Sequence, residues 1–275
     1  MKRLVTPQGA IHYEEKGEGP AVIFLHAALA DHRQWGVQAD ALSHDYRCII
    51  YDLAGYGASD PALDRNDPAK TLLALMDHLE LSTAALVGSS LGGSIALHTA
   101  LQYSDRIRSI MVFGTGLFGF QPKLNAPEPA TYREYEAALM AHEVERIVEL
   151  AEVIWLTGVS GHKEDVPEAS RKLFRIMYRE LLLFHPDGSF DQEGLDDTRG
   201  IANLPIPALI VIGEHDTAFC RAVADYLEQA LPHSKVVLMR EAAHFPNLSK
   251  PKTVTELIAQ WNSDPGSVEP PNPCG

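Results

Sequence analysis

The residues best suited to chemistry form a serine turn between glycines, Gly88-Ser89-Ser90-Leu91-Gly92. The segment matches the pattern G-x-S-x-G, in which a sharp strand-to-helix turn lifts the central serine above a sheet. An apolar strand-like run precedes it and a helical pattern follows it, which a plain glycine-rich turn would not require. A phosphate-binding loop would carry a lysine after its glycines, and none follows here. The spacing therefore selects Ser90, rather than its neighbour Ser89, as a nucleophile.

A serine hydroxyl is a weak nucleophile unless a nearby base accepts its proton. The chain has 12 histidines, so position must select the base. Only His244, in the segment EAAHFPN, follows the last strand-like run, 235–240, and it precedes the final helical pattern. Where such a serine turn works with two partners, the chain order is serine, acid and histidine. We therefore predict His244 as the general base.

The acid should stand in a loop at the end of a strand between the serine and the base. The segment GEHD ends the apolar run 207–213, and its Asp216 is the fitting carboxylate. Glu214 is the nearest alternative, but it sits closer to the end of the strand. Asp216 would hold the base in one tautomer and stabilise the imidazolium that forms during reaction.

The elements that must position these residues alternate along the chain. Helical spacing of apolar residues separates strand-like runs, and 11–17 alternates polar and apolar residues as an antiparallel strand does. Continuous apolar runs of this kind are typical of strands covered on both faces. These runs occupy 21–26, 47–52, 84–88, 109–114, 207–213 and 235–240. The predicted helices occupy 68–80, 91–103, 219–230 and 250–262. The pattern predicts an α/β fold with a mostly parallel, doubly wound sheet.

Strand-like runs disappear between residues 119 and 200, where helical patterns at 131–143, 144–157 and 168–184 replace them. We therefore predict an α/β core domain formed by 1–118 and 201–263, interrupted by a helical cap at 119–200. The last residues, 264–275, are rich in proline and glycine and are predicted to form a loose tail.

Composition narrows the classes of partner. The formal net charge is −14, and no cluster of lysine and arginine offers the basic surface that nucleic acid or an anionic membrane requires. No apolar run is long enough for a membrane helix, and the N-terminal residues do not form a secretory signal. Three cysteines at unrelated spacings suggest neither disulfides nor zinc. We expect a soluble, cytoplasmic protein, and the sequence leaves a homodimer open.

Five segments, in chain order, resemble the α/β-hydrolase superfamily: IFLHAALADHRQW, YDLAGYGASD, VGSSLGG, GEHD and AAHFPN. The resemblance spans residues 10–262 and points to small capped esterases and lactonases, including the 3-oxoadipate enol-lactonase-like and haloperoxidase-like groups. It implies an oxyanion hole formed by the backbone N–H groups of Ala28 and Leu91. Ala27 stands where such proteins usually have glycine. By the same resemblance, His26 is a structural residue of this loop rather than a second base.

The predicted cap is rich in bulky apolar residues, which favours small to medium apolar substrates. We predict pocket walls from residues of the cap, its entrance and the base loop: Leu117, Phe118, Met140, Trp155 and Phe245.

The combined prediction is a serine hydrolase that cleaves a carboxylic ester or lactone through an acyl-enzyme on Ser90, without a cofactor. The same three residues also serve C–C bond hydrolases and cofactor-free perhydrolases, so these remain alternatives, as does a slow-turnover ligand receptor. A metalloenzyme is disfavoured, because His142-Glu143 lacks the second histidine of an H-E-x-x-H motif.

Overall fold

The computed structural model describes residues 1–61, 67–124, 129–184 and 194–265. The described residues form an eight-stranded sheet in the order β1-β2-β4-β3-β5-β6-β7-β8. The strands are β1 (Lys2–Thr6), β2 (Gly9–Lys16), β3 (Ala21–Leu25), β4 (Arg47–Tyr51), β5 (Ala84–Ser89), β6 (Ile107–Phe113), β7 (Ala208–Gly213) and β8 (Ser234–Met239). β1 and β2 pair antiparallel with their neighbours, and the other six strands run parallel. The predicted α/β architecture is confirmed.

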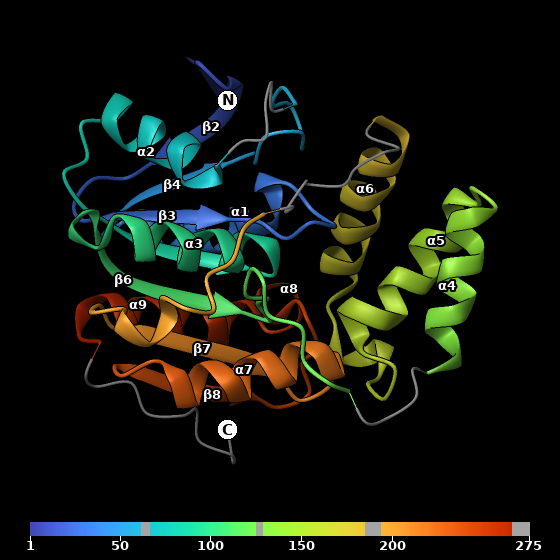
Figure 1. The fold of residues 1–275 in the computed structure, drawn as a ribbon. Helices are drawn as coiled ribbons and strands as arrows, with labels where there is room; N and C mark the ends of the chain where they lie inside the picture. Colours follow the sequence, from blue (N-terminus) through green and yellow to red (C-terminus); the bar gives the residue numbers. More distant parts are fainter. Residues whose placement is uncertain (62–66, 125–128, 185–193, 266–275) are drawn as a thin grey trace.

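Helices cover both faces of the sheet (Figure 1). The α-helices of the described residues, including those of the segment between β6 and β7, are α1 (Gly36–Leu42), α2 (Pro68–His78), α3 (Leu91–Gln102), α4 (Ala130–Met140), α5 (Val144–Ala151), α6 (Glu168–Phe184), α7 (Ala218–Ala230), α8 (Pro246–Ser249) and α9 (Pro251–Ser263). Short helical turns are η1 (His32–Trp35), η2 (Ser104–Arg106), η3 (Glu152–Thr157), η4 (Lys163–Asp165) and η5 (Ile201–Asn203).

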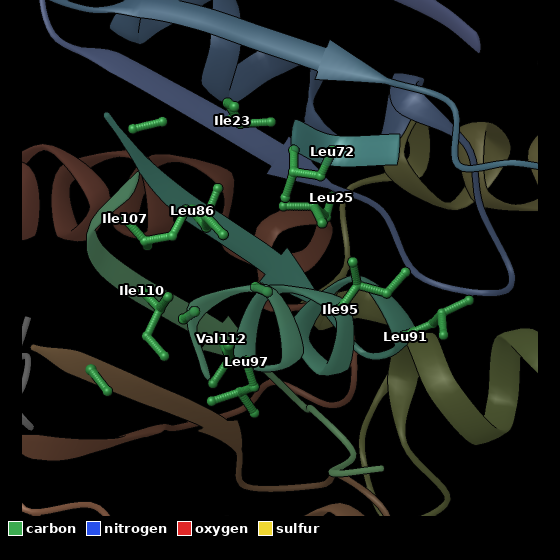
Figure 2. Packing of buried hydrophobic residues seen from close by; sticks show 14 of the residues in the cluster. Ile23, Leu25, Leu72, Leu86, Leu91, Ile95, Leu97, Ile107, Ile110 and Val112 are labelled. Atoms are coloured by element: carbon green, nitrogen blue, oxygen red, sulfur yellow. The ribbon is translucent and has the colours of Figure 1, made fainter. Parts of the chain in front are cut away.

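The strands are apolar throughout because both of their faces are covered. Along β3, Ile23 and Leu25 pack in the cluster shared with α2, α3 and α7. The alternate residues, Val22 and Phe24, pack in the cluster shared with α1 and α9. Figure 2 shows the first cluster, in which Leu97 on α3 lies beside strand side chains such as Val112. Two buried layers therefore hold the parallel strands in register.

Between β6 and β7 the chain forms a helical insertion, which we define as α4, α5, η3 and α6. It lies beyond the ends toward which the parallel strands point (Figure 1). Its apolar residues form a third cluster, which also contains Ala27 and Phe245 from loops of the core. The insertion therefore packs on the loops that carry the predicted site. Of the predicted tail, only its first two residues lie within the described ranges.

Three details of the fold differ from the prediction. The predicted helix at 144–157 ends as an α-helix at Ala151 and continues as the π-helical turn η3. The short edge strand β1 and the helix α1 were not predicted, because β1 is largely exposed and α1 has only seven residues. Neither element interrupts the alternation that predicts the fold class.

Candidate active site

Ser90 occupies a strained turn between β5 and α3. Its backbone has φ 52° and ψ −116°, a conformation that costs energy for any residue with a side chain. Glycine on either side makes the turn feasible, since a Cβ at Gly88 would lie 2.4 Å from the carbonyl oxygen of Gly92. The Ser90 N–H donates to the carbonyl of Phe113 at 2.8 Å, which fixes the turn to the end of β6. Ser90 is half-buried between fully buried neighbours, as an accessible nucleophile should be.

His244 and Asp216 form a buried pair at the ends of β8 and β7. The Nδ1–H of His244 donates to Oδ1 of Asp216 at 2.9 Å, and the Thr217 N–H donates to the same oxygen at 2.7 Å. Both side chains are buried. With Nδ1 engaged, the ring atom left to accept a proton is Nε2.

Gly114 ties this pair to the serine turn. It follows Phe113, whose carbonyl accepts the hydrogen bond from Ser90, and it has a φ of 51°. A Cβ at this position would lie 2.7 Å from both Asp216 Oδ2 and His244 Nδ1. The end of β6 therefore contacts all three predicted catalytic residues, and only glycine fits there.

The electrostatics of the pair are dominated by two opposing effects. Burial lowers the pKa of His244, because it disfavours the charged ring. The Asp216 carboxylate, with a smaller contribution from Cys220, outweighs burial and raises the pKa of His244 well above its ordinary value. The same carboxylate would stabilise the imidazolium that forms when His244 accepts a proton.

Glu214, the alternative acid, points elsewhere. Its Oε2 accepts a hydrogen bond from the Glu241 N–H at 2.9 Å. The structure therefore brings Asp216, and not Glu214, to the His244 ring.

The loop after β3 holds the two alanines of the predicted oxyanion hole region. Ala27 is buried, and its φ is not positive, so alanine adopts this backbone without strain. Ala28 is half-buried, and Leu91 is buried at the start of α3. A Cβ at Gly92 would lie 2.3 Å from the carbonyl oxygen of Leu25, so the helix start and this loop approach closely. Within the described ranges, the N–H groups of Ala28 and Leu91 make no hydrogen bond.

His26 has both ring nitrogens occupied. The Leu53 N–H donates to Nε2 at 2.9 Å, so Nδ1 carries the proton and donates to the carbonyl of Ala27 at 2.8 Å. Burial lowers the pKa of His26, which keeps the ring neutral. This geometry agrees with the structural role that the resemblance implies.

Two of the five predicted pocket residues lie beside the base. The Trp155 carbonyl accepts a hydrogen bond from the His244 N–H at 3.0 Å. The Phe245 ring lies 5.4 Å from the His244 ring and 5.2 Å from the ring of Phe174 on α6. The helical insertion therefore contacts the base loop directly.

The other three predicted pocket residues do not reach this position. Leu117 and Phe118 are buried in the core cluster, and the Phe118 ring packs 5.5 Å from His98. Met140, at the end of α4, is 78% exposed. A side chain this exposed cannot wall an enclosed pocket, so Met140 is not retained in the site.

A cavity of about 350 Å³ opens beside the acid. Asp216 lines it together with Tyr132 and Ile154 of the insertion and Phe219 of α7. The sequence did not single out Tyr132 or Phe219 as pocket residues, because helical periodicity cannot separate a pocket face from a packing face.

Two clusters in the described part of the chain have the composition of metal sites, but most of their polar atoms have protein partners; one exception is Asp216 Oδ2, which is buried without a hydrogen bond. In the first, His244 donates to Asp216, and the Cys220 thiol lies 3.3 Å from the Gly114 carbonyl. In the second, His32 donates to Asp52 and Arg33 donates to Asp31. None of the helices in the described ranges combines the length and apolar character that a membrane crossing requires.

Comparison with known proteins gives one consistent result. A model of the alpha/beta hydrolase fold family matches residues 20–251. Pimeloyl-[acyl-carrier protein] methyl ester esterase of Nitrosomonas europaea is 29% identical, covering 88% of this chain and 96% of the relative. 3-oxoadipate enol-lactonase 2 of Acinetobacter baylyi is 24% identical, covering 94% and 95%. Bifunctional epoxide hydrolase 2 of Sus scrofa is 22% identical over 94% of this chain, which spans 54% of that relative's length.

Solved structures agree on the fold. The enol-lactonase from Burkholderia xenovorans superposes with a TM-score of 0.76 at 20% identity, covering 96% of this chain and all of the other. Because the family model spans most of the chain and the sheet has the matching topology, this protein belongs to the alpha/beta hydrolase fold family.

Proposed function

We propose that this protein is a serine hydrolase that cleaves a carboxylic ester or lactone of a small to medium apolar substrate. The observation that carries the proposal is the buried His244–Asp216 hydrogen bond next to the strained Ser90 turn. Relatives named as esterases and enol-lactonases support the same reaction class at 24–29% identity.

In the proposed mechanism, Nε2 of His244 accepts the Ser90 hydroxyl proton as Oγ attacks the ester carbonyl carbon. The N–H groups of Ala28 and Leu91 donate to the oxyanion of the tetrahedral intermediate. Collapse breaks the bond to the alkoxy group, which takes the proton from His244 and leaves an acyl-enzyme. Water then attacks the acyl carbon with His244 again as base, and Ser90 is regenerated.

The proposal is tested by stopped-flow hydrolysis of p-nitrophenyl esters from acetate to decanoate. Wild type should show a burst of nitrophenolate of about one equivalent per enzyme, followed by steady turnover. The chain length with the highest kcat/KM should report the size of the acyl pocket. Ser90→Ala should lower turnover by about 10³-fold or more.

Ser89→Ala is the matched control, because Ser89 is fully buried one residue away and its hydroxyl is outside the mechanism. It should keep turnover within about threefold of wild type, as expected for a change outside the catalytic machinery. Negligible turnover of every ester by wild type, or near-full activity of Ser90→Ala, would contradict the proposal. Since no step uses a metal ion, EDTA should leave the rate unchanged, and a large loss would also contradict it.

A further inference from the structure

A pair of buried amides joins the loop after β3 to the loop that carries the base. Gln34 lies in η1 and Asn247 in α8, and both side chains are buried. Gln34 Nε2 donates to Asn247 Oδ1 at 3.2 Å, and Asn247 Nδ2 donates back to the Gln34 carbonyl at 2.9 Å. Asn247 follows His244 by three residues. The pair therefore bridges two segments more than 200 positions apart in the sequence.

The oxygen of the Gln34 side-chain amide contacts the loop after β3, which carries Ala27 and Ala28 and is called the oxyanion loop below. The Ala27 N–H donates to Gln34 Oε1 at 2.8 Å. Since Ala27 can only donate here, the oxygen of Gln34 must face it, and the nitrogen must face Asn247. The directions of both amides are thus set by the backbone groups they meet.

The next peptide, between Ala27 and Ala28, is fixed through its carbonyl. The Ala27 carbonyl accepts from His26 Nδ1–H at 2.8 Å and from the Ala30 N–H at 3.1 Å. In a planar trans peptide the N–H points away from the C=O. With Ala27 held at both its N–H and its carbonyl, the Ala28 N–H is directed away from these partners and is left free.

We propose that Gln34 and Asn247 are positioning residues that set the Ala28 N–H relative to His244. The inference rests on the proposed function, since it assigns Ala28 the oxyanion. Gln34 controls where the donor points, and Asn247 links that donor to the loop of the base. Stabilising an oxyanion requires donors that are already in place before charge develops.

The test compares Gln34→Met, Asn247→Leu and the double variant with wild type, using the best p-nitrophenyl ester. Removing one oxyanion donor outright costs about 10²–10³-fold in kcat. Gln34→Met leaves the Ala28 donor in place but removes the acceptor of the Ala27 N–H in the preceding peptide, so kcat should fall by roughly tenfold or more. KM should change by less than about threefold, because the ground-state ester makes little use of the donor. Affinity for a boronic acid transition-state analogue should fall in parallel with kcat.

Gln38→Leu is the matched control. Gln38 is a buried amide one helical turn beyond Gln34, and its Nε2 donates to the Asn247 and Pro251 carbonyls without touching the oxyanion loop. It should lower the thermal midpoint about as much as Gln34→Met, while kcat stays within about twofold of wild type.

The double variant separates positioning from stability. In the double variant neither amide side chain is left facing a missing partner, so its loss of stability should be smaller than the sum of the two single losses, although the Ala27 N–H and the Gln34 carbonyl remain without partners. Activity should stay low, because the Ala27 N–H still lacks its acceptor. If kcat recovers in the double variant, or if Gln38→Leu loses as much kcat as Gln34→Met, the inference is wrong. A wild type without burst or turnover would instead overturn the proposed function itself.

Discussion

Two regions of the molecule are stabilised by different interactions: the edge of the sheet formed by the carboxyl ends of the parallel strands, where the proposed catalytic residues lie, and the helical insertion. At the sheet edge, backbone hydrogen bonds and close glycine contacts fix the serine turn, and apolar layers lie on both sides. In the insertion, the buried Glu152 of η3 pairs with Arg171 and Arg175 of α6. The two regions meet where the Trp155 carbonyl of η3 accepts the His244 N–H.

This difference indicates which region tolerates change. A close-packed backbone allows almost no displacement, so a single atom added near the proposed catalytic residues should cost activity. Ion pairs between helices are weakened by salt, and removing one partner of a buried pair lowers the stability of the fold. Changes at the sheet edge should therefore act mainly on kcat, and changes in the insertion mainly on stability.

The largest effect is expected for Asp216→Asn, which removes the charge that supports the base. Loss of this carboxylate in a serine triad costs about 10⁴-fold in kcat. Because His244 must be neutral to act as base, wild-type kcat/KM should fall as pH drops through the raised pKa of His244. Asp216→Asn removes the largest of the effects that raise the pKa of His244, so the acidic limb should move to lower pH.

Glu214→Gln is the control for this change and should stay within about threefold of wild type, because Glu214 faces Glu241 and not the base. Equal losses in the two variants, measured as pH profiles of kcat/KM, would show that the acid is misassigned.

The next largest effect is expected for Gly114→Ala. The new methyl would meet Asp216 and His244 at 2.7 Å, and the positive φ disfavours alanine. Displacement of the His244–Asp216 pair should lower kcat by about 10²-fold, because small misplacements of catalytic groups greatly reduce the rate. Gly36→Ala is the control, because a Cβ there meets nothing within 4 Å. Full activity in Gly114→Ala would contradict the close packing described for this edge.

In the insertion, Glu152→Gln should lower the free energy of unfolding by about 2 kcal/mol. This loss of stability is smaller than the usual cost of breaking a buried ion pair because the Arg175 side chain is 40% exposed. Glu134→Gln removes a surface pair with Arg146 and should change stability by less than about 0.5 kcal/mol. Urea unfolding measures both, and equal effects would refute a special role for the buried pair.

The smallest effect is expected on the pH dependence of stability and concerns His98 on α3. Its side chain connects α3 to Asp197, in the segment that follows the insertion. Its Nδ1 lies 2.8 Å from Asp197, and its Nε2 lies 3.3 Å from Asp67. Burial lowers the pKa of His98, but the two carboxylates outweigh it and raise the pKa above its ordinary value.

When the pKa of a histidine is higher in the folded state than in the unfolded state, protonation stabilises the fold. This contribution to the free energy of unfolding is fully present below the unfolded-state pKa and is lost as the pH rises through the folded-state pKa. The stability difference between wild type and His98→Gln should therefore be largest near pH 5.5 and shrink toward pH 9. Replacement of the exposed His44 should leave the profile unchanged. A difference that grows with pH would contradict the assignment of charge.

The sequence predicts the sheet and the positions of the three proposed catalytic residues because periodicity and chain order are local signals. Ser90, Asp216 and His244 each end or follow a strand-like run. The Gln34–Asn247 contact is invisible to such signals, because it joins two ordinary polar residues 213 positions apart. Met140 was misplaced for a related reason, since an apolar residue on a helix can face solvent as well as a pocket.

The most direct test of the central claim is covalent labelling with a fluorophosphonate, read by intact-mass and peptide mass spectrometry. A serine hydrolase with Ser90 as nucleophile should take up one label per chain, on the peptide that contains Ser90. Ser90→Ala should take up none, and Asp216→Asn should label far more slowly. A label on any other residue, or an unlabelled wild type that is correctly folded, would contradict the account.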